Sequence, residues 1–193
     1  MNWSLIDYID HVKFECFISP TTSKNLNHEG DSLICENEEF RIKGGIPRFV
    51  NSNNYSQAFG LQWKKFKRTQ FDSYTNTNIT EKRLEEAIGH PLSRISGKRI
   101  LEAGSGAGRF TEILLKYGAI VHSFDYSVAV EANYENNMPH DKLTLFQADI
   151  GKIPLPSNMF DYVICLGVLQ HTPSIKKSLE ELKRVLKPNG LIV

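Results

Sequence analysis

The feature that most constrains the fold of this chain is a glycine-rich turn that joins a short apolar run to an amphipathic segment. Residues 99–101 read as a buried strand, and the apolar side chains of residues 110–117 recur at helical spacing. The turn between them places glycine at alternate positions, namely Gly104, Gly106 and Gly108. Glycine allows a sharp turn and a close approach to a ligand, because it has no Cβ. A strand, a tight turn and a helix in this order predict one unit of a parallel α/β sheet.

From Lys98 onward, predicted strands and helices alternate. Four more strands are predicted at residues 119–124, 142–147, 162–166 and 191–193. Ser127 is expected to cap the helix after the second strand, and Thr172 and Pro173 are expected to begin the last helix. This alternation predicts an open parallel sheet wound with helices. We therefore expect a domain at 97–193 whose sheet is truncated after its fifth strand.

The first half of the chain predicts two smaller units. Residues 1–53 contain short apolar stretches broken by Ser, Asn, Asp and Gly, which predict a small β-rich module. Residues 54–96 are interpreted as a helical lid or linker segment. Its aromatic side chains follow helical spacing, at Phe59, Trp63 and Phe66. The basic run at 64–68 is interpreted as a solvated helix face and not as a nucleic-acid contact, because the aromatic residues fall on the opposite stripe.

Bulk properties argue against several classes of protein. The 193 residues carry a formal net charge of +1, which provides no overall attraction for nucleic acid or an anionic membrane. No apolar run approaches the roughly 20 residues needed to span a bilayer, and the N-terminus lacks the pattern of a secretory signal, so the expected location is cytoplasmic. Three scattered cysteines, Cys16, Cys35 and Cys165, indicate reduced thiols and not a disulfide framework.

An acidic residue follows the second predicted strand at a spacing typical of a ribose ligand. Asp125 comes roughly 20 residues after Gly104, the separation expected for an acid that accepts from ribose hydroxyls. Open parallel sheets bind ligands beyond the carboxyl ends of their strands, and the N-terminus of the following helix favours an anion such as a carboxylate. The simpler alternatives are an ordinary tight turn at Gly104 and a solvated helix cap at Asp125.

The third glycine separates two classes of nucleotide-binding enzyme. A dinucleotide pattern, G-x-G-x-x-G, would need glycine where Arg109 stands. The glycines follow G-x-G-x-G instead, and in this the chain resembles the class I S-adenosylmethionine-dependent methyltransferases, which have a Rossmann-like fold. Further segments resemble the later motifs of that family in the same order, at 124–127, 147–150, 160–173 and 186–190.

The resemblance implies S-adenosylmethionine as the cofactor and a set of residues that bind it. Asp125 would bind the ribose, Asp149 and the Ile150 backbone would contact the adenine, and Tyr126 would pack against its ring. Leu166 and Gly167 would pass beneath the methionine portion. The implied cofactor-binding residues are Glu102, Gly104, Ser105, Gly106, Gly108, Asp125, Tyr126, Asp149, Ile150, Leu166 and Gly167. A loop cap for Asp149 and a core aromatic for Tyr126 stay open as alternatives.

His171 is the candidate catalytic residue, because it follows the fourth strand toward the expected cleft and an imidazole can act as a base near neutral pH. Methyl transfer from a sulfonium needs no acid, since the leaving group is a neutral thioether and alignment supplies much of the acceleration. A base matters for a protonated nucleophile such as a hydroxyl. Many family members have two histidines here, whereas this chain has Gln170 before His171, so we favour a structural or substrate-orienting role.

The N-terminal module resembles a zinc-ribbon-like module of the Trm112 type, which accompanies some methyltransferases. The resemblance rests on residues 16–19, 35–38 and 45–50. Each knuckle of such a module offers two cysteines, but Ser19 and Glu38 stand at the second positions here. A structural zinc normally takes four ligands, so we expect the module to hold no metal.

These patterns predict an S-adenosylmethionine-dependent methyltransferase that acts on an unidentified small-molecule or sugar-containing acceptor. Residues 59–63 also resemble a helix that covers the cofactor in bacterial relatives, which makes Gln62 and Trp63 lid candidates. Two alternatives stay open: a non-catalytic module that binds the cofactor or a partner, and a nicotinamide-dependent oxidoreductase. We expect no nucleic-acid or membrane partner, and the sequence leaves the oligomeric state open.

Overall fold

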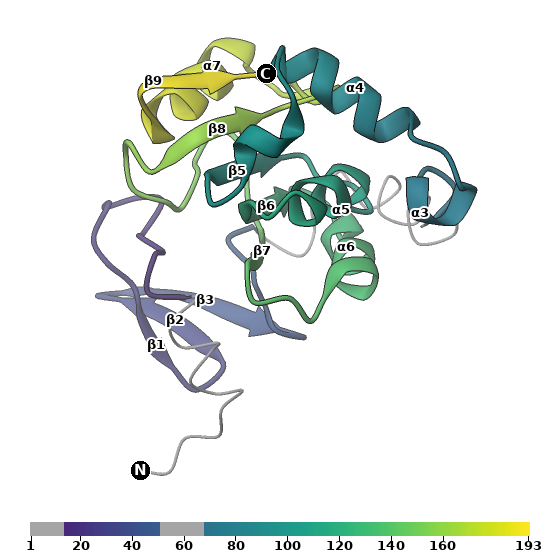
Figure 1. Cartoon of the computed structure of the whole chain (residues 1–193). Coiled ribbons are helices and arrows are strands. Elements are labelled where there is room, and N and C mark those ends of the chain that lie inside the picture. Colours follow the sequence, from purple (N-terminus) through teal and green to yellow (C-terminus); the bar gives the residue numbers. More distant parts are fainter. Residues whose placement is uncertain (1–13, 51–67) are drawn as a thin grey trace.

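The computed structural model describes residues 14–50 and 68–193, which contain a parallel and an antiparallel sheet (Figure 1). The parallel sheet has the strand order β7-β6-β5-β8-β9. Its strands are β5 (Arg99–Ala103), β6 (Ile120–Asp125), β7 (Leu143–Gln147), β8 (Phe160–Ile164) and β9 (Leu186–Ile192). The chain crosses from one side of β5 to the other between β7 and β8, so the order reverses at β5. The predicted open, Rossmann-like parallel sheet is confirmed.

Helices cover both faces of the parallel sheet. They are α3 (Asp72–Thr75), α4 (Ile79–Ile88), α5 (Arg109–Lys116), α6 (Ala129–Asn137) and α7 (Ile175–Val185), with the 3-10 turns η1 (Leu92–Ile95) and η2 (Leu169–His171). Side chains alternate along β5, so Ile100 packs with α4 and α5 on one face, while Leu101 packs with α7 on the other. None of the helices in the described ranges is long and apolar enough to cross a membrane.

The antiparallel sheet lies against the β7 edge of the parallel sheet. Its strands are β1 (Asn27–Glu29), β2 (Ser32–Cys35), β3 (Glu38–Lys43) and β4 (Ile46–Pro47). The Phe49 N–H donates to the Gln147 carbonyl at 2.8 Å, and the rings of Phe17 and Phe146 meet edge to face at 5.2 Å. Figure 1 shows these purple and blue strands beside β7. The predicted β-rich N-terminal module is confirmed, whereas its boundary at 53 and the one at 96 stay predictions.

The last helix begins later than the sequence predicts. Thr172, which is extended with φ −88° and ψ 146°, is the C-cap of η2, and its N–H and hydroxyl both donate to the Leu169 carbonyl, at 3.1 and 2.8 Å. A residue before proline is biased toward this conformation, because the ring of Pro173 crowds the backbone of its neighbour. Ser174 is the cap instead, and its Oγ accepts from the Lys177 N–H at 3.4 Å. Ser127 also differs from its expected place: Val128 is the N-cap of α6, although the Ser127 Oγ still accepts from the Ala129 N–H at 3.1 Å.

The fourth and fifth strands also begin earlier than predicted, because they pair with each other from the end of α7. Phe160 lies opposite Leu186, and Tyr162 lies opposite Leu191, with a register irregularity between the two pairs. The Pro188-Asn189-Gly190 segment falls within this irregularity, where Asn189 adopts a positive φ of 65°. Its residue types are typical of a turn, but here they form a bulge within a strand.

Candidate active site

A cavity of about 360 Å³ lies at the carboxyl ends of β5, β6 and β8. The strand order reverses there, which is the usual ligand position in an open parallel sheet, and the volume suits a small molecule. The sequence-predicted residues that line it are Gly104, Ser105, Gly106, Asp125, Tyr126, Asp149, Ile150, Leu166, Gly167 and His171. The structure therefore brings together residues from four loops, whereas Glu102 and Gly108 do not line the cavity.

The glycine turn is fixed to the end of β6 by its own backbone. The N–H groups of Gly104 and Ser105 both donate to the Phe124 carbonyl, at 2.8 and 2.9 Å. Gly104 and Gly106 have positive φ values of 82° and 53°, a region that favours glycine. A Cβ at Gly104 would lie 2.3 Å from a methyl group of Val168, so the turn also needs glycine for close packing.

Asp125 is oriented by hydrogen bonds from both neighbouring loops. Its Oδ2 accepts from the Gly106 N–H at 2.9 Å, and its Oδ1 accepts from the Ser127 N–H and Oγ at 2.8 and 2.7 Å. The carboxylate thus joins the glycine turn to the loop that begins α6 while it also lines the cavity. Its predicted contact with a ribose stays a prediction.

The predicted adenine end of the cavity is built at the carboxyl end of β7. Asp149 accepts from the Gly151 N–H through Oδ1 at 2.7 Å, which shapes the loop that carries Ile150. On the other side, the Gln147 Nε2 donates to the Tyr126 carbonyl at 2.9 Å and fixes that backbone. These contacts place Asp149, Ile150 and Tyr126 around one end of the cavity.

Glu102 lies beneath the glycine turn and points away from the cavity. It is 2% exposed, and its Oε2 accepts from the hydroxyls of Thr111 and Ser123. Its Oε1 is buried with no hydrogen-bond partner among the described residues. Burial raises the pKa of Glu102 to about 7, although the two hydroxyls oppose that change. Glu102 does not line the cavity and joins β5, α5 and β6 through its carboxyl group, while its predicted contact with the cofactor stays a prediction.

Gly108 is a packing residue in this structure. A Cβ there would lie 2.2 Å from the Asn133 Oδ1 and 2.5 Å from the Asn137 Nδ2, so α6 can approach the turn only because the Cβ is missing. The Asn137 Nδ2 donates to the Gly108 carbonyl at 3.1 Å, and the Asn136 Nδ2 donates to the Ala107 carbonyl at 3.0 Å. The sequence analysis missed these asparagines, although three amides at positions i, i+3 and i+4 of one helix were a visible signal.

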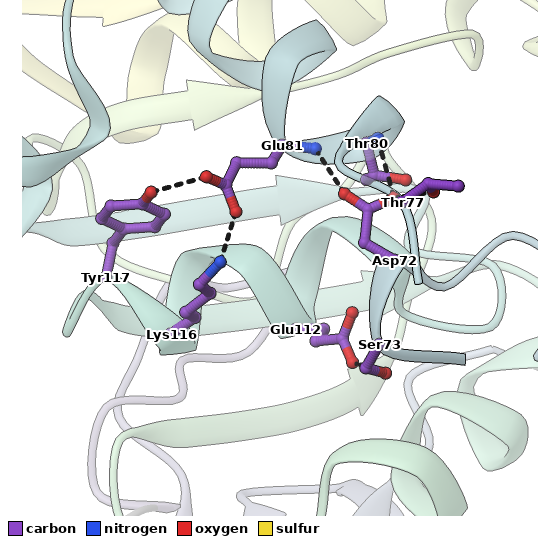
Figure 2. Close-up of polar contacts among 8 residues, drawn as sticks. All are labelled: Asp72, Ser73, Thr77, Thr80, Glu81, Glu112, Lys116 and Tyr117. Atoms are coloured by element: carbon purple, nitrogen blue, oxygen red, sulfur yellow. Dashed lines mark hydrogen bonds and ion pairs between the residues drawn. The ribbon is translucent and has the colours of Figure 1, made fainter. Parts of the chain in front are cut away.

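The α3–α4 segment forms a wall of the cavity and is fixed to α5 by polar contacts (Figure 2). Asp72 accepts from the backbone N–H groups of Thr80 and Glu81 at 3.0 and 2.9 Å, which satisfies the N-terminus of α4. Glu81 in turn accepts from the Tyr117 hydroxyl at 2.7 Å and forms an ion pair with Lys116. These contacts hold the helix that carries Arg83 beside the helix that begins with Arg109.

This wall and the start of α5 contribute cavity residues that were not predicted from the sequence, namely Gln70, Phe71, Arg83, Arg109 and Phe110. Arg109 was noted only because it breaks the dinucleotide pattern. Nothing in the sequence singles out Arg83, since its position depends on how α4 packs against α5.

His171 lines the cavity from the end of η2, next to Thr172 and Pro173. Its N–H donates to the Val168 carbonyl at 2.9 Å, so its backbone is fixed by the 3-10 turn. His171 therefore lies where the sequence predicts it, after the fourth strand and at the cavity. Its catalytic role stays a prediction. The lid candidates Gln62 and Trp63, and most of the helix expected around them, lie outside the described residues.

The two non-cysteine positions of the expected zinc-ribbon-like knuckles contact each other. The Ser19 hydroxyl donates to the Glu38 carboxylate, while Cys35 packs in the apolar core. The Cys16 Sγ lies 3.7 Å from the Nε2 of His122 on β6. The described ranges contain no group of three or more His, Cys, Asp or Glu side chains arranged to hold a metal. The resemblance of the module to a zinc ribbon, and its expected lack of metal, stay predictions.

Comparison with known proteins assigns the parallel sheet to a family. Residues 101–193 match a family model described as a methyltransferase domain. This part of the chain is similar to the domain of the methyltransferases, and we call it the methyltransferase domain. A crystal structure of an S-adenosylmethionine-dependent methyltransferase from Aquifex aeolicus is 28% identical, with a TM-score of 0.55 over 69% of this chain and 71% of that one. The predicted cofactor, S-adenosylmethionine, and the predicted enzyme class are confirmed for the methyltransferase domain.

The curated relatives that match this chain are longer proteins. A highly reducing polyketide synthase of Aspergillus terreus is 30% identical over 98% of this chain and 9% of its own length. A sterol 24-C-methyltransferase of Gibberella zeae is 33% identical over 56% of this chain and 30% of its own length. The chain spans less than a third of the length of either relative. The sequence similarity thus assigns the domain and leaves the acceptor unassigned.

Proposed function

We propose that this protein transfers a methyl group from S-adenosylmethionine to a small-molecule acceptor. The observation that carries the proposal is the cavity at the reversal of strand order, where the glycine turn and the Asp125 carboxylate are fixed to each other. A nucleoside fits such a site, because the carboxylate can accept from ribose hydroxyls while the turn admits the ligand without a Cβ.

The cofactor would extend along the cavity from β7 toward the glycine turn. Asp149 and Ile150 would contact the adenine, and Tyr126 would pack against it. Asp125 would hold the ribose. The methionine portion would lie over Gly104–Gly106, with Leu166 and Gly167 on its other side, and with the N-terminus of α5 favouring its carboxylate.

Catalysis would depend on alignment more than on proton transfer. The sulfonium leaves as a neutral thioether, so the protein needs to hold the nucleophile in line with the methyl group. His171 lines the same cavity and would orient the acceptor, or remove a proton from it if the nucleophile is a hydroxyl. Phe71 and Phe110 are nearly buried where they line the cavity, and they would exclude water from the transfer.

The names of the relatives favour a small organic acceptor. One relative is a polyketide synthase and another is a sterol methyltransferase. The second name gives a sterol as the methyl acceptor, the first gives a polyketide as the product, and neither gives a nucleic acid. A sugar-containing acceptor stays within the proposal.

Calorimetry with S-adenosylmethionine, S-adenosylhomocysteine, NAD and NADP tests the proposal first. We expect saturable binding of the first two and none of the nicotinamide nucleotides. Tight binding of NAD alone would contradict the proposal in favour of an oxidoreductase. A methyl-transfer assay over a broad acceptor panel then separates an enzyme from a module that binds the cofactor without turnover.

A further inference from the structure

Two arginines line the part of the cavity that the predicted cofactor residues do not account for. Arg83 lies on α4, Arg109 is the first residue of α5, and both line the same cavity. Within residues 14–50 and 68–193, neither guanidinium has a hydrogen-bond or ion-pair partner. Two like charges that share a cavity repel each other, so this arrangement favours an anion between them.

The structure holds the two arginines before any ligand binds. The ion pair of Glu81 with Lys116, and its hydrogen bond from Tyr117, attach the first turn of α4 to the end of α5 (Figure 2). The Arg109 guanidinium also lies 4.7 Å from the centre of the Phe110 ring, which is a cation–π contact. Guanidinium groups bind carboxylate and phosphate in a planar, bidentate geometry. Because the helices that carry the two arginines are attached to each other, less backbone entropy is lost when the pair binds such a group.

Nearby acids do not neutralise the pair. Burial, and then the charge of Arg83, lower the pKa of Arg109, whereas the charges of Glu102 and Asp72 raise it. Asp72 is engaged by two backbone N–H groups at the N-terminus of α4. Burial raises the pKa of Glu102 to about 7, so this carboxyl group is partly protonated at neutral pH. The positive charge of the pair therefore faces the cavity.

The cofactor supplies one carboxylate at most, which does not balance two guanidiniums. S-adenosylmethionine carries a sulfonium, an ammonium and a carboxylate, so its net charge at neutral pH is positive. The acids that line the cavity, Asp125 and Asp149, belong to its nucleotide part. An anion that enters with the second substrate would balance the two guanidiniums, and the positive field would steer it toward the cavity.

We infer that Arg83 and Arg109 bind a carboxylate or phosphate group of the methyl acceptor. The inference rests on the proposed function, because it places the acceptor beside S-adenosylmethionine in one cavity. It assigns the acceptor to the class of anionic small molecules. The two guanidiniums would hold the anionic group at the wall, so that the nucleophile at the other end of the acceptor faces the sulfonium methyl group.

Inorganic phosphate, titrated into the 193-residue protein saturated with S-adenosylhomocysteine, tests the pair. The arginine Nε–H signals are followed by NMR spectroscopy. We expect saturable shifts in the wild type, and phosphate binding about tenfold weaker or more in R83Q and in R109Q, since each loses a charge-assisted contact. The matched control is R94Q, because Arg94 is an exposed arginine on η1 outside the cavity. We expect R94Q to change the binding by less than about twofold, since it removes the same charge without a contact.

The same variants show whether the anion belongs to the acceptor or to the cofactor. Calorimetry with S-adenosylhomocysteine should give affinities for R83Q and R109Q within about twofold of wild type, because no cofactor contact is removed. If R83Q and R109Q bound S-adenosylhomocysteine more weakly but phosphate as well as wild type does, the pair would belong to the methionine carboxylate, and the inference would be overturned. The inference would also be overturned if the phosphate-induced NMR shifts of the wild type did not saturate, or if R94Q weakened phosphate binding as much as R83Q and R109Q do. If the wild type bound no S-adenosylhomocysteine, the proposed function would fail, and phosphate titration of the free protein would still test the pair.

Arg83 is exposed, so R83Q keeps the test valid if R109Q does not fold.

Discussion

Two carboxyl groups on neighbouring strands have opposite environments. Asp125 ends β6 at the cavity, where three donors from the backbone and a hydroxyl surround it. Glu102 lies within β5, is buried, and receives hydrogen bonds from two hydroxyls on one oxygen only. In the sequence, Glu102 precedes the glycine turn and Asp125 follows the next strand, and both positions make them cofactor candidates. Burial separates their roles: Asp125 is available to a ligand, while Glu102 supports the turn from beneath.

Replacing Asp125 tests the ribose contact. We expect D125A to weaken binding of S-adenosylhomocysteine by about 1 to 3 kcal/mol, because ribose hydroxyls and the Gly106 N–H lose their acceptor. Calorimetry measures the change, and D141A serves as the control, since the Asp141 side chain is 80% exposed and lies outside the cavity. Unchanged affinity in a folded D125A protein would remove Asp125 from the ribose site.

Glu102 should make the stability of the protein depend on pH. Its pKa is about 7 in the folded protein, against an ordinary value of 4.5, so the folded state holds the proton more tightly than the unfolded state. The stability that protonated Glu102 contributes is fully present below its ordinary pKa of 4.5, and it is lost as the pH rises through about 7. We expect E102Q, which stays neutral, to gain on the order of 2 to 3 kcal/mol relative to wild type between pH 5 and pH 8. Urea unfolding at both pH values measures this.

A second buried group, His122, also makes the stability depend on pH. The effect of Glu102 is therefore measured as the difference in stability between E102Q and wild type at each pH. Burial, and then the charge of Arg99, lower the pKa of His122 to about 4. The stability that the neutral His122 contributes is present above its ordinary pKa of 6.5 and is lost as the pH falls toward 4. This pH dependence is opposite to that of Glu102. Both proteins contain His122, so its effect cancels in their difference. Parallel stability curves for E102Q and wild type would contradict a buried carboxyl group with a raised pKa.

At the scale of elements, α6 explains why the turn needs its third glycine. The amide side chains of Asn133 and Asn137 occupy the space that a Cβ at Gly108 would fill. Asn133 also donates to the hydroxyls of Thr111 and Ser123, at 2.9 and 3.2 Å, which connects α6 to the network around Glu102. The motif glycine therefore sets the distance between two helices and does not touch the cavity.

Alanine substitutions at two glycines separate this packing from backbone strain. Gly108 and Gly89 have similar positive φ values, 89° and 78°, but only Gly89 has open space where a Cβ would go. We expect G89A to cost about 1 to 2 kcal/mol from the left-handed conformation alone. G108A should cost about 1 to 3 kcal/mol more, since the asparagines must move. Urea unfolding of both variants measures the difference, and equal costs would mean that α6 adjusts freely.

Elements were predictable from the sequence where local patterns decide them. The glycine turn, the strand at β6 and the helix after the turn follow from spacing and residue type alone. The start of α7 and the bulge in β9 did not, because Thr172 closes η2 through its bonds to Leu169, and residues 188–190 are placed by the pairing of β9 with β8. The roles of Gly108 and Arg83 depend on how helices pack, which a single sequence does not encode in any local pattern.

On the scale of the whole molecule, the two sheets share one apolar core. Phe17 from the N-terminal module and Phe146 from β7 belong to the same cluster, together with Leu182 from α7. The N-terminal strands continue along the β7 edge through the bonds of Arg48 and Phe49 to Gln147. An edge strand that would otherwise offer unpaired backbone groups is covered in this way. The module is therefore part of the support of the cavity, although residues so far apart in the sequence gave no sign of it.

Arg48 is the polar connection between the module and the cofactor loops. It donates to the Gln147 Oε1 at 3.0 Å and to the Glu131 Oε1 at 3.1 Å, and Gln147 donates in turn to the Tyr126 carbonyl. The Arg48 side chain is only 11% exposed, and burial lowers its pKa even though Glu131 opposes this. Removing its charge ends the ion pair with Glu131, which joins a nearly buried guanidinium to a carboxylate on α6.

We expect R48Q to lower the free energy of unfolding by about 1 to 3 kcal/mol. It should also weaken binding of S-adenosylhomocysteine, because Arg48 no longer positions the Gln147 side chain that donates to the Tyr126 carbonyl. Arg41 provides the matched control: it also lies in the antiparallel sheet and forms an ion pair, with Glu39, but its side chain is 65% exposed. R41Q should therefore change the stability by less than about 0.5 kcal/mol. Urea unfolding and calorimetry on both variants decide whether the N-terminal sheet supports the cofactor site. An R48Q protein as stable as R41Q, with unchanged affinity, would show that the two sheets pack together without energetic coupling.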